Sequence, residues 1–275
     1  MIKLIASDMD GTFLNPQGSY DKRRFQDLLR QLTERNILFV VASGNRMERL
    51  RQIFAEVSDN IDYVAENGAL VIDKGNLLAR QTMPNHLVDA VVVFFADKLK
   101  SYRVILSGVE ASYVLQGTSF EFGTAAVSQD ELRQFFSNLV YLEDLTKRPK
   151  DPIVKITMMV DSDDVDEVTQ QFNQEFHGDL RAVSSGYGAV DIIQSSVHKA
   201  WGLQVLMAKY KIKPEEVAAF GDSGNDKELL NLAKYSFAMA NATQDIKNVA
   251  CYQIASNAED AVLTTIEKIL SGEIK

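Results

Sequence analysis

The chain has 275 residues, 46% of them hydrophobic and 24% charged, a composition typical of a folded protein with one large or two ordinary domains. Its net charge of −9 argues against nucleic acid as the main partner, because binding to a phosphate backbone requires clustered lysines and arginines. The single cysteine, Cys251, excludes an intrachain disulfide and a cysteine-rich zinc site. Neither a secretory signal nor an apolar run of about 20 residues is found, which predicts a cytoplasmic protein without a membrane partner.

Both ends of the chain alternate between strand-like and helix-like segments. Apolar, β-branched runs predict strands, and apolar residues at helical spacing predict helices. The first elements expected are a strand at 2–6, a helix from about 19 through 32, a strand at 37–42, a helix through 47–54 and a strand at 63–65. Near the C-terminus we expect a helix around 201–207, a strand at 217–220, a helix at 229–233, a strand at 236–239, a last strand ending at 254 and a helix at 261–270. This α/β order predicts a parallel sheet with helices on its faces.

The middle of the chain has a different pattern. Helical stretches alternate there with pairs of short strands, at 87–99, 102–106, 112–115, 153–160 and 164–176. This order predicts an antiparallel sheet with helices on one face, which is an α+β module. We therefore expect two domains, a core formed by residues 1–82 and 188–275 and a second domain, 83–187, inserted into it.

Two acidic residues, Asp8 and Asp10, follow the first predicted strand directly. Ligands of parallel α/β sheets bind at the carboxyl ends of the strands. Two carboxylates this close are electrostatically unfavourable unless a cation lies between them. Taken alone, the pair fits an active site and an ordinary turn before a helix equally well.

A second acidic pair, Asp222 and Asp226, also follows a hydrophobic strand and precedes a helix. Two such clusters at the carboxyl ends of strands in one sheet can converge on a hard cation. Mg²⁺ prefers oxygen ligands and is usually completed by water and substrate phosphate. No histidine or cysteine accompanies the clusters, which disfavours zinc.

Two further segments could bind phosphate. Ser43, Gly44 and Asn45 follow the second strand and precede a helix, where a hydroxyl and backbone N–H groups can hold an anion. A serine in this place is also a common helix cap. Lys199 lies near the start of a predicted helix, a mildly unfavourable place for a cation unless an anion faces it. Alone, it reads more readily as a solvated surface residue.

Together the four segments resemble a known family. The strand followed by Asp8-Met9-Asp10-Gly11-Thr12, then Ser43, Lys199 and Gly221–Asp226, is similar to the haloacid dehalogenase superfamily of phosphatases. The insertion between the serine and the lysine resembles the cap of its Cof-type subgroup (subfamily IIB). Within that subgroup the sequence is most similar to bacterial sugar phosphatases of the SupH/YbiV type, and this similarity is strongest outside the insertion, in segments such as 8–14, 39–45 and 221–226. The resemblance spans essentially the whole chain. It implies a Rossmann-like parallel-sheet core with an inserted α+β cap domain of the C2B type.

The resemblance also implies catalytic roles. Asp8 would be the nucleophile that forms an aspartyl-phosphate, and Asp10 the general acid and then base. For the first half-reaction Asp10 must hold a proton, so its pKa should lie above that of Asp8. The cofactor implied is Mg²⁺, held by the Asp8 carboxylate, the Asp10 backbone carbonyl and Asp222.

Other residues would surround the phosphate. The resemblance implies that Ser43 and Lys199 bind the phosphoryl oxygens, with Gly44 and Asn45 beside the serine. Asn225 would add a polar contact near the phosphate. Asp226 would orient Lys199 and the water shell of the metal.

One position departs from the family pattern. Many relatives have Thr-Gly-Arg where this chain has Ser43-Gly44-Asn45. Asn45 cannot provide the bidentate cationic fork that arginine offers to phosphate. Whether Arg46 compensates stays open, since the next residue on a helix points about 100° away.

The function expected is Mg²⁺-dependent hydrolysis of small phosphomonoesters, with a phosphorylated sugar as substrate. One alternative is a sugar phosphomutase or phosphotransferase that uses the same intermediate. Another is a phosphometabolite-binding protein without turnover. Substrate specificity should come from the inserted domain, where the spacing of residues does not identify the substrate. The sequence is equally compatible with a monomer and a small homo-oligomer.

Overall fold

The computed structural model describes residues 1–57, 60–120, 139–186 and 188–274. The chain forms two compact units, which we call the core unit (Met1–Arg80 with Val197–Lys275) and the inserted unit (Gln81–Ser196). Each unit contains its own sheet. The α/β core with an α+β insertion agrees with the fold class predicted from the sequence.

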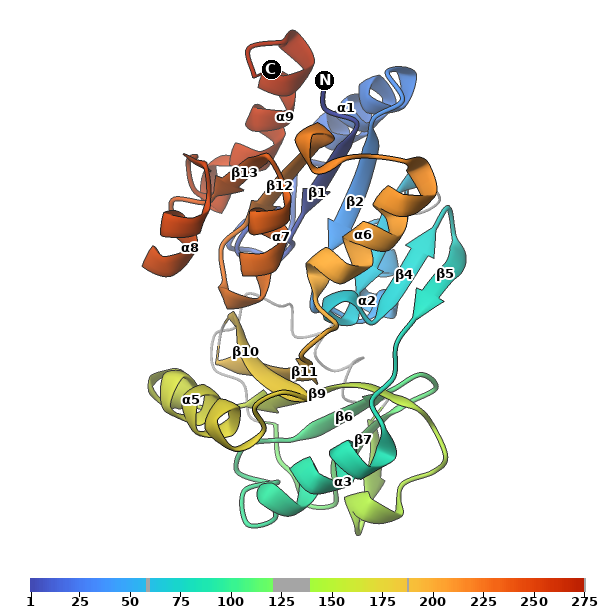
Figure 1. The fold of residues 1–275 in the computed structure, drawn as a ribbon, viewed down its shortest axis with the longest axis vertical. Coiled ribbons are helices and arrows are strands. Elements are labelled where there is room, and N and C mark those ends of the chain that lie inside the picture. Colours follow the sequence, from blue (N-terminus) through green and yellow to red (C-terminus); the bar gives the residue numbers. More distant parts are fainter. Residues whose placement is uncertain (58–59, 121–138, 187, 275) are drawn as a thin grey trace. The chain divides into compact units, whose positions relative to one another are not determined.

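The core unit is built on an eight-stranded sheet (Figure 1). Its strands are β1 (Leu4–Ser7), β2 (Leu38–Ala42), β3 (Asp62–Ala65), β4 (Leu70–Asp73), β5 (Asn76–Arg80), β12 (Val217–Gly221), β13 (Tyr235–Ala238) and β14 (Tyr252–Gln253). They follow the order β14-β13-β12-β1-β2-β3-β4-β5. The first six of these are parallel, and β4 and β5 are antiparallel additions at one edge. The chain runs from β1 to β2 on one side and returns to β12 on the other, so a topological switch point lies at the carboxyl end of β1.

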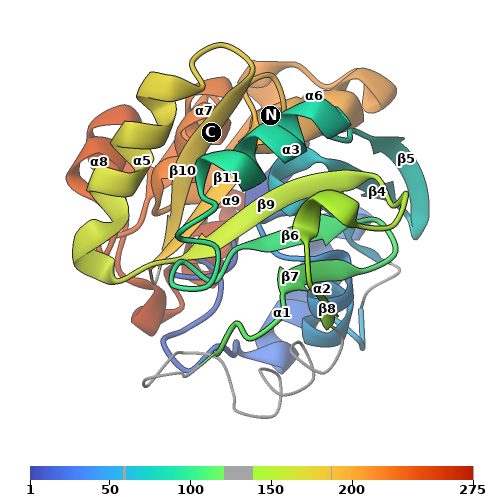
Figure 2. The same cartoon turned by 90° about the horizontal axis from the view of Figure 1, so that it is seen from below.

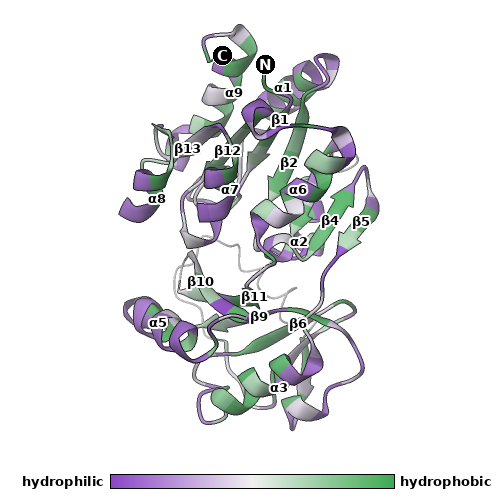
Figure 3. Cartoon of the chain, viewed as in Figure 1, coloured by the Kyte–Doolittle hydropathy of each residue, from purple (hydrophilic) through white to green (hydrophobic). Residues whose placement is uncertain are grey.

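Helices cover both faces of this sheet. They are α1 (Lys22–Glu34), α2 (Met47–Ile53), α6 (Lys199–Tyr210), α7 (Lys227–Leu232), α8 (Gln244–Val249) and α9 (Ala261–Ser271). Figures 1 and 2 show α6 and α7 on one face and α1 and α2 on the other. Strands covered on both faces must be apolar throughout, and the inner strands are hydrophobic along their length (Figure 3).

Helix α1 shows how sequence sets these elements. The Asp21 side chain accepts a hydrogen bond from the Arg24 backbone N–H and so caps the helix, which begins at Lys22. Its apolar residues recur at helical spacing and are all buried, namely Phe25, Leu28, Leu29 and Leu32. Phe25 packs edge-on against Phe13 and Phe39, with ring centroids 4.9 and 5.0 Å away. These rings join α1 to the carboxyl side of β1 and to β2.

The β4–β5 hairpin was not predicted from the sequence. Its turn places Lys74 and Gly75 at φ values of 47° and 79°. A lysine seldom adopts this left-handed conformation, so the sequence carries no strong turn signal. The Asp62 carboxylate accepts a hydrogen bond from the Lys74 backbone N–H at 2.9 Å and stabilises the turn.

The inserted unit contains a six-stranded sheet with the order β10-β11-β9-β6-β7-β8. Its helices and strands among the described residues are α3 (Asn85–Phe94), β6 (Ile105–Gly108), β7 (Ser112–Leu115), β8 (Leu139–Leu142), β9 (Ile153–Met159), α5 (Val165–Glu175), β10 (Leu180–Gly186) and β11 (Ala189–Gln194). Neighbouring strands are antiparallel except β7 and β8. Both helices pack on the same face of the sheet (Figure 2), where they share one apolar cluster with its strands.

The end of the inserted unit differs from the expected boundary at 187/188. Strand β11 pairs with β10 and β9, so residues 189–194 belong to the inserted sheet, and the contact division falls after Ser196. The expected boundary falls within the β10–β11 hairpin, and Tyr187 itself lies outside the described residues.

Candidate active site

The predicted site residues follow three neighbouring strands of the core sheet. Asp8 and Asp10 follow β1, Ser43 follows β2, and Asp222 follows β12. These strands are parallel neighbours, so their carboxyl ends lie at the same edge. Lys199, the first residue of α6, reaches the same place.

Lys199 lies between two carboxylates. Its Nζ donates to Oδ1 of Asp8 at 2.6 Å and to Oδ1 of Asp226 at 2.7 Å. All three side chains are buried. The alternative that Lys199 is a solvated surface residue is therefore wrong.

Asp226 is fixed by several donors. Besides Lys199, its Oδ2 accepts hydrogen bonds from the backbone N–H groups of Asp222 and Ser223, at 3.0 and 3.1 Å. The carboxylate thereby closes the turn after β12 and holds Lys199 toward Asp8. This geometry is the one expected of a residue that orients Lys199.

Asp8, Asp222 and Asp226 form a group that could hold a metal ion. One carboxylate oxygen from each lies within 4.8 Å of the others. Thr12 donates to Asp222 Oδ1 at 2.7 Å and fixes that side chain. Burial, followed by repulsion from Asp226, raises the pKa of Asp8 and raises that of Asp222 to about 7. Three carboxylates facing one ammonium are an all-oxygen donor set with surplus negative charge, which fits a hard divalent cation.

The Asp10 side chain points to a different set of partners. Arg49, on α2, donates from Nη1 to Oδ2 at 2.9 Å and from Nη2 to Oδ1 at 3.0 Å. Asn45 Nδ2 donates to Oδ2 at 2.5 Å. Burial alone would raise the pKa of Asp10, but the Arg49 charge and these hydrogen bonds lower it.

The order of the two pKa values is thus the reverse of the one expected from the sequence. Asp8 is buried beside two further carboxylates, whereas Asp10 faces a guanidinium. Both shifts have a clear electrostatic cause. The protein's own groups therefore favour an ionised Asp10, the form that acts as a base.

The segment from Ser43 to Asn45 connects the two sides of the site. The Ser43 hydroxyl oxygen accepts from the Asn45 backbone N–H at 3.1 Å and from Asn45 Nδ2 at 2.9 Å. Gly44 lies between them in the loop after β2. Helix α2 begins only at Met47, with Arg46 as its cap, so Ser43 is not a helix-capping residue.

The question left open for Arg46 has a structural answer. Its Nε lies 3.3 Å from a Glu48 carboxylate oxygen and 3.7 Å from one of Glu66. The arginine that contacts Asp10 is Arg49, which the sequence analysis missed. The spacing of Asn45 and Arg49 gave no signal, because Asn45 precedes α2, which begins at Met47, and the helical i,i+4 rule applies only within a helix.

Asn225 is buried and held at both ends of its amide. Its Nδ2 donates to Asn67 Oδ1 at 2.9 Å, and its Oδ1 accepts from the Ser223 hydroxyl at 2.9 Å. Asn67 also donates its backbone N–H to the Ser43 carbonyl at 3.0 Å. The Glu66-Asn67-Gly68 segment therefore both turns the chain between β3 and β4 and supports the site. These contacts link the β12 turn to the β2 loop.

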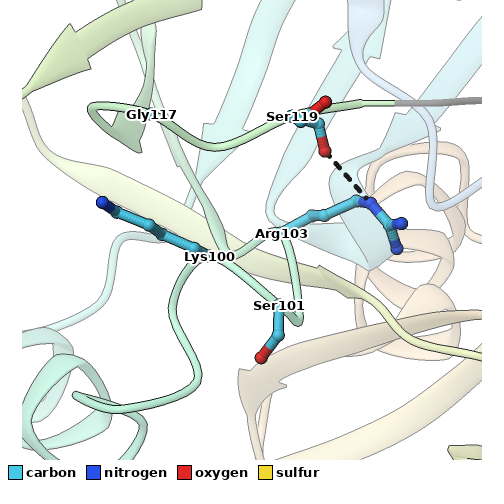
Figure 4. A pocket seen from close by; sticks show the side chains of 5 residues that line it. All are labelled: Lys100, Ser101, Arg103, Gly117 and Ser119. Atoms are coloured by element: carbon cyan, nitrogen blue, oxygen red, sulfur yellow. Dashed lines mark hydrogen bonds between the residues drawn. The ribbon is translucent and has the colours of Figure 1, made fainter.

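A cavity in the inserted unit has a different character. It has a volume of about 340 Å³ and is lined by Lys100, Ser101, Arg103, Gly117 and Ser119. Figure 4 shows Lys100 and Arg103 pointing in opposite directions, with Arg103 Nε donating to the Ser119 carbonyl at 3.2 Å. The five lining residues include no carboxylate, and the two cations do not converge. The cavity therefore lacks the acid–base groups found at the end of β1.

Comparison with known proteins agrees with the geometry at the sheet edge. Residues 5–266 match the family model of haloacid dehalogenase-like hydrolases. The chain belongs to this family. The resemblance seen in the sequence is thereby confirmed, and the match includes the inserted unit as well as the core strands.

Relatives of this hydrolase cover nearly the whole chain. YbjI of Escherichia coli strain K12, a 5-amino-6-(5-phospho-D-ribitylamino)uracil phosphatase, is 33% identical over 272 residues, which are 99% of this chain and 97% of that protein. An HMP-PP phosphatase of Klebsiella pneumoniae strain 342 is 26% identical over 248 residues, 90% of this chain and 87% of that one. The crystal structure of SMU.1108c from Streptococcus mutans UA159 has a TM-score of 0.87 at 36% identity, covering 98% of this chain and 100% of that chain. The two relatives that are named phosphatases confirm the prediction of a phosphatase.

The helices in the described part of the hydrolase are short. Among the described residues, none is long and apolar enough to cross a membrane.

Proposed function

We propose that this protein is a Mg²⁺-dependent phosphatase that hydrolyses small phosphomonoesters, with sugar or sugar-alcohol phosphates as substrates, through an aspartyl-phosphate on Asp8. The observation that carries the proposal is the pairing of Asp8 with Lys199 at 2.6 Å, beside the carboxylates of Asp222 and Asp226. A cation next to a nucleophilic carboxylate can stabilise a phosphoryl group during its transfer. A second carboxylate, Asp10, lies two residues away to move protons.

In the first half-reaction an Asp8 carboxylate oxygen attacks phosphorus and the P–O ester bond breaks. The leaving oxygen takes its proton from Asp10. Approach of the negatively charged phosphate to Asp10 raises the pKa of that carboxyl, which favours the protonated form the step requires. In the second half-reaction Asp10 removes a proton from water, the water oxygen attacks phosphorus, and the bond to Asp8 breaks to release inorganic phosphate.

Other residues stabilise the transferring group. Lys199 and Ser43 would bind its oxygens, and Asn45 holds the Ser43 hydroxyl in place at 2.9 Å. Asn225 would support the Ser43 loop through its hydrogen bond to Asn67, and Asp226 would hold Lys199 in place. A Mg²⁺ ion held by Asp8, Asp222 and the Asp10 carbonyl would neutralise phosphoryl charge and align the in-line displacement.

The substrate class is supported by a relative. YbjI is named for a substrate whose phosphate is attached to a ribityl group. Since this chain matches it over 99% of its length, a phosphorylated sugar or sugar alcohol is the substrate class we propose.

The test is phosphate release from a panel of small phosphomonoesters. The panel should contain a ribityl phosphate ester, a pentose phosphate, a hexose phosphate and p-nitrophenyl phosphate. We expect release that depends on Mg²⁺, stops with EDTA and is lost in Asp8→Asn. Full activity in Asp8→Asn, or formation of an isomeric sugar phosphate instead of free phosphate, would contradict the proposal.

A further inference from the structure

Arg49 contacts the acid–base group of the site with a two-point fork. Its Nη1 and Nη2 donate to the two oxygens of Asp10 at 2.9 and 3.0 Å. Two parallel hydrogen bonds fix both the position and the plane of a carboxyl group. Asp10 is not held by burial alone, because 28% of its side chain is exposed. Its orientation therefore depends on these donors.

Asn45 supports the same carboxyl group from the β2 loop. Its amide donates to Asp10 and to the Ser43 hydroxyl oxygen, at 2.5 and 2.9 Å. Arg49, Asp10, Asn45 and Ser43 are thus connected by consecutive hydrogen bonds. These hydrogen bonds fix the Asp10 carboxyl group, which transfers the proton, relative to the Ser43 hydroxyl, which we propose binds phosphate.

We propose that Arg49 is a positioning residue that aims the Asp10 carboxyl group for proton transfer. The inference rests on the proposed function, in which Asp10 protonates the leaving oxygen. Asn45 has no guanidinium, and Arg46 faces Glu48 and Glu66. Arg49, within α2 and three residues after Arg46, supplies the fork that these two residues do not.

Whether the general acid is needed depends on the leaving group of the substrate. An alkoxide needs a proton to depart, whereas p-nitrophenolate departs without one. The ratio kcat/KM reports the steps up to and including P–O cleavage. Substitution of a residue that acts through the general acid should therefore lower kcat/KM strongly for alkyl phosphates and only slightly for p-nitrophenyl phosphate. A residue that binds the phosphoryl group would matter equally for both substrates.

The experiment compares Arg49→Gln with the wild-type enzyme on an alkyl sugar phosphate and on p-nitrophenyl phosphate, at saturating Mg²⁺. We expect kcat/KM for the alkyl substrate to fall on the order of a hundredfold, the effect of a small misplacement of a reacting group, and that for the aryl substrate to change little. Arg49→Lys should recover little, because an ammonium cannot form the fork. Arg51→Gln is the matched control, since Arg51 lies exposed on the same helix.

Asp10→Asn separates failure of this inference from failure of the proposed function. It should show the same selective loss, and Arg49→Gln should add nothing in its background. If Asp10→Asn is selective but Arg49→Gln lowers kcat/KM equally for both substrates, or for neither, the positioning role is wrong and the proposed function stands. If Asp10→Asn itself is not selective, the role of Asp10 is wrong and the inference fails with it.

Discussion

Lys199 lies at the centre of the site's charge balance. Burial alone would lower its pKa, but the carboxylates of Asp226 and Asp8 raise it, so the ammonium stays charged. Breaking a buried pair by removing one partner typically costs about 3–5 kcal/mol, since it leaves an uncompensated charge. One ammonium cannot balance the charge of three carboxylates. A divalent cation would neutralise the negative charge that is left.

This surplus predicts a pH dependence of stability. The pKa of Asp222 is raised to about 7 by burial and by Asp226, from an ordinary value near 3.9 in the unfolded chain. Between these values the folded protein binds a proton that the unfolded chain does not. We therefore expect the contribution of Asp222 to the free energy of unfolding to fall as pH rises from about 5 to 8, by a few kcal/mol in order of magnitude.

Thermal unfolding across this pH range, in EDTA and in excess Mg²⁺, measures the effect. We expect Tm in EDTA to fall with rising pH, and Mg²⁺ to restore it most strongly at pH 8 because it binds the ionised carboxylates. Asp222→Asn should reduce both the fall and the restoration. A Tm in EDTA that rises over this range, or that Mg²⁺ leaves unchanged, would contradict the charge assignment.

The backbone of the turn after β1 is constrained by its close contact with the Asp222 side chain. Gly11 has φ +80°, and a Cβ atom there would collide with the Asp222 carboxylate. Asn241 donates to the Gly11 carbonyl at 2.7 Å and holds the turn in place. The close approach lets the β1 turn and the β12 carboxylate share one small site.

Comparison of Gly11→Ala with Gly75→Ala separates the effect of the contact with Asp222 from the effect of backbone strain at a glycine. Gly75 has φ +79° in the β4–β5 turn, and a Cβ atom there would have nothing within 4 Å. Both substitutions introduce left-handed strain of about 1–2 kcal/mol, but only Gly11→Ala displaces Asp222. We expect Gly75→Ala to lower Tm with kcat/KM intact, and Gly11→Ala to abolish both phosphatase activity and stabilisation by Mg²⁺. Similar activity in the two variants would show that the contact is unimportant.

Elements with strong periodicity could be predicted from the sequence, and those that depend on unusual backbone could not. The apolar spacing of α1 and the apolar runs of β1, β2 and β12 led directly to a parallel sheet with acidic residues at its carboxyl edge. The β4–β5 hairpin escaped because Lys74 adopts a conformation typical of glycine or asparagine. Arg49 escaped because its contact depends on where α2 begins, and the helix starts at Met47 rather than beside Ser43.

At the scale of the whole molecule, the order of segments carried more information than any one segment. Four short motifs predicted the core unit and its site, because residues at the ends of parallel strands must meet at one edge. The limits of the inserted unit were harder to place. From the sequence we expect residues from 188 onward in the core, and only the pairing of strand β11 with β9 and β10 assigns residues 189–194 to the inserted sheet. The two units have separate apolar clusters, which is why each pattern could be recognised independently.

The central claim is that the phosphoryl group is carried on Asp8. Asp10→Asn tests it directly with p-nitrophenyl phosphate, whose leaving group needs no proton, because loss of the base should slow hydrolysis of the intermediate more than its formation. The measurement is mass spectrometry of peptides after rapid acid quenching in Mg²⁺. We predict that one phosphoryl group accumulates on the peptide containing Asp8 and is absent in the Asp8→Asn, Asp10→Asn double variant. Turnover without any phosphorylated peptide, or with phosphate on another residue, would contradict the account.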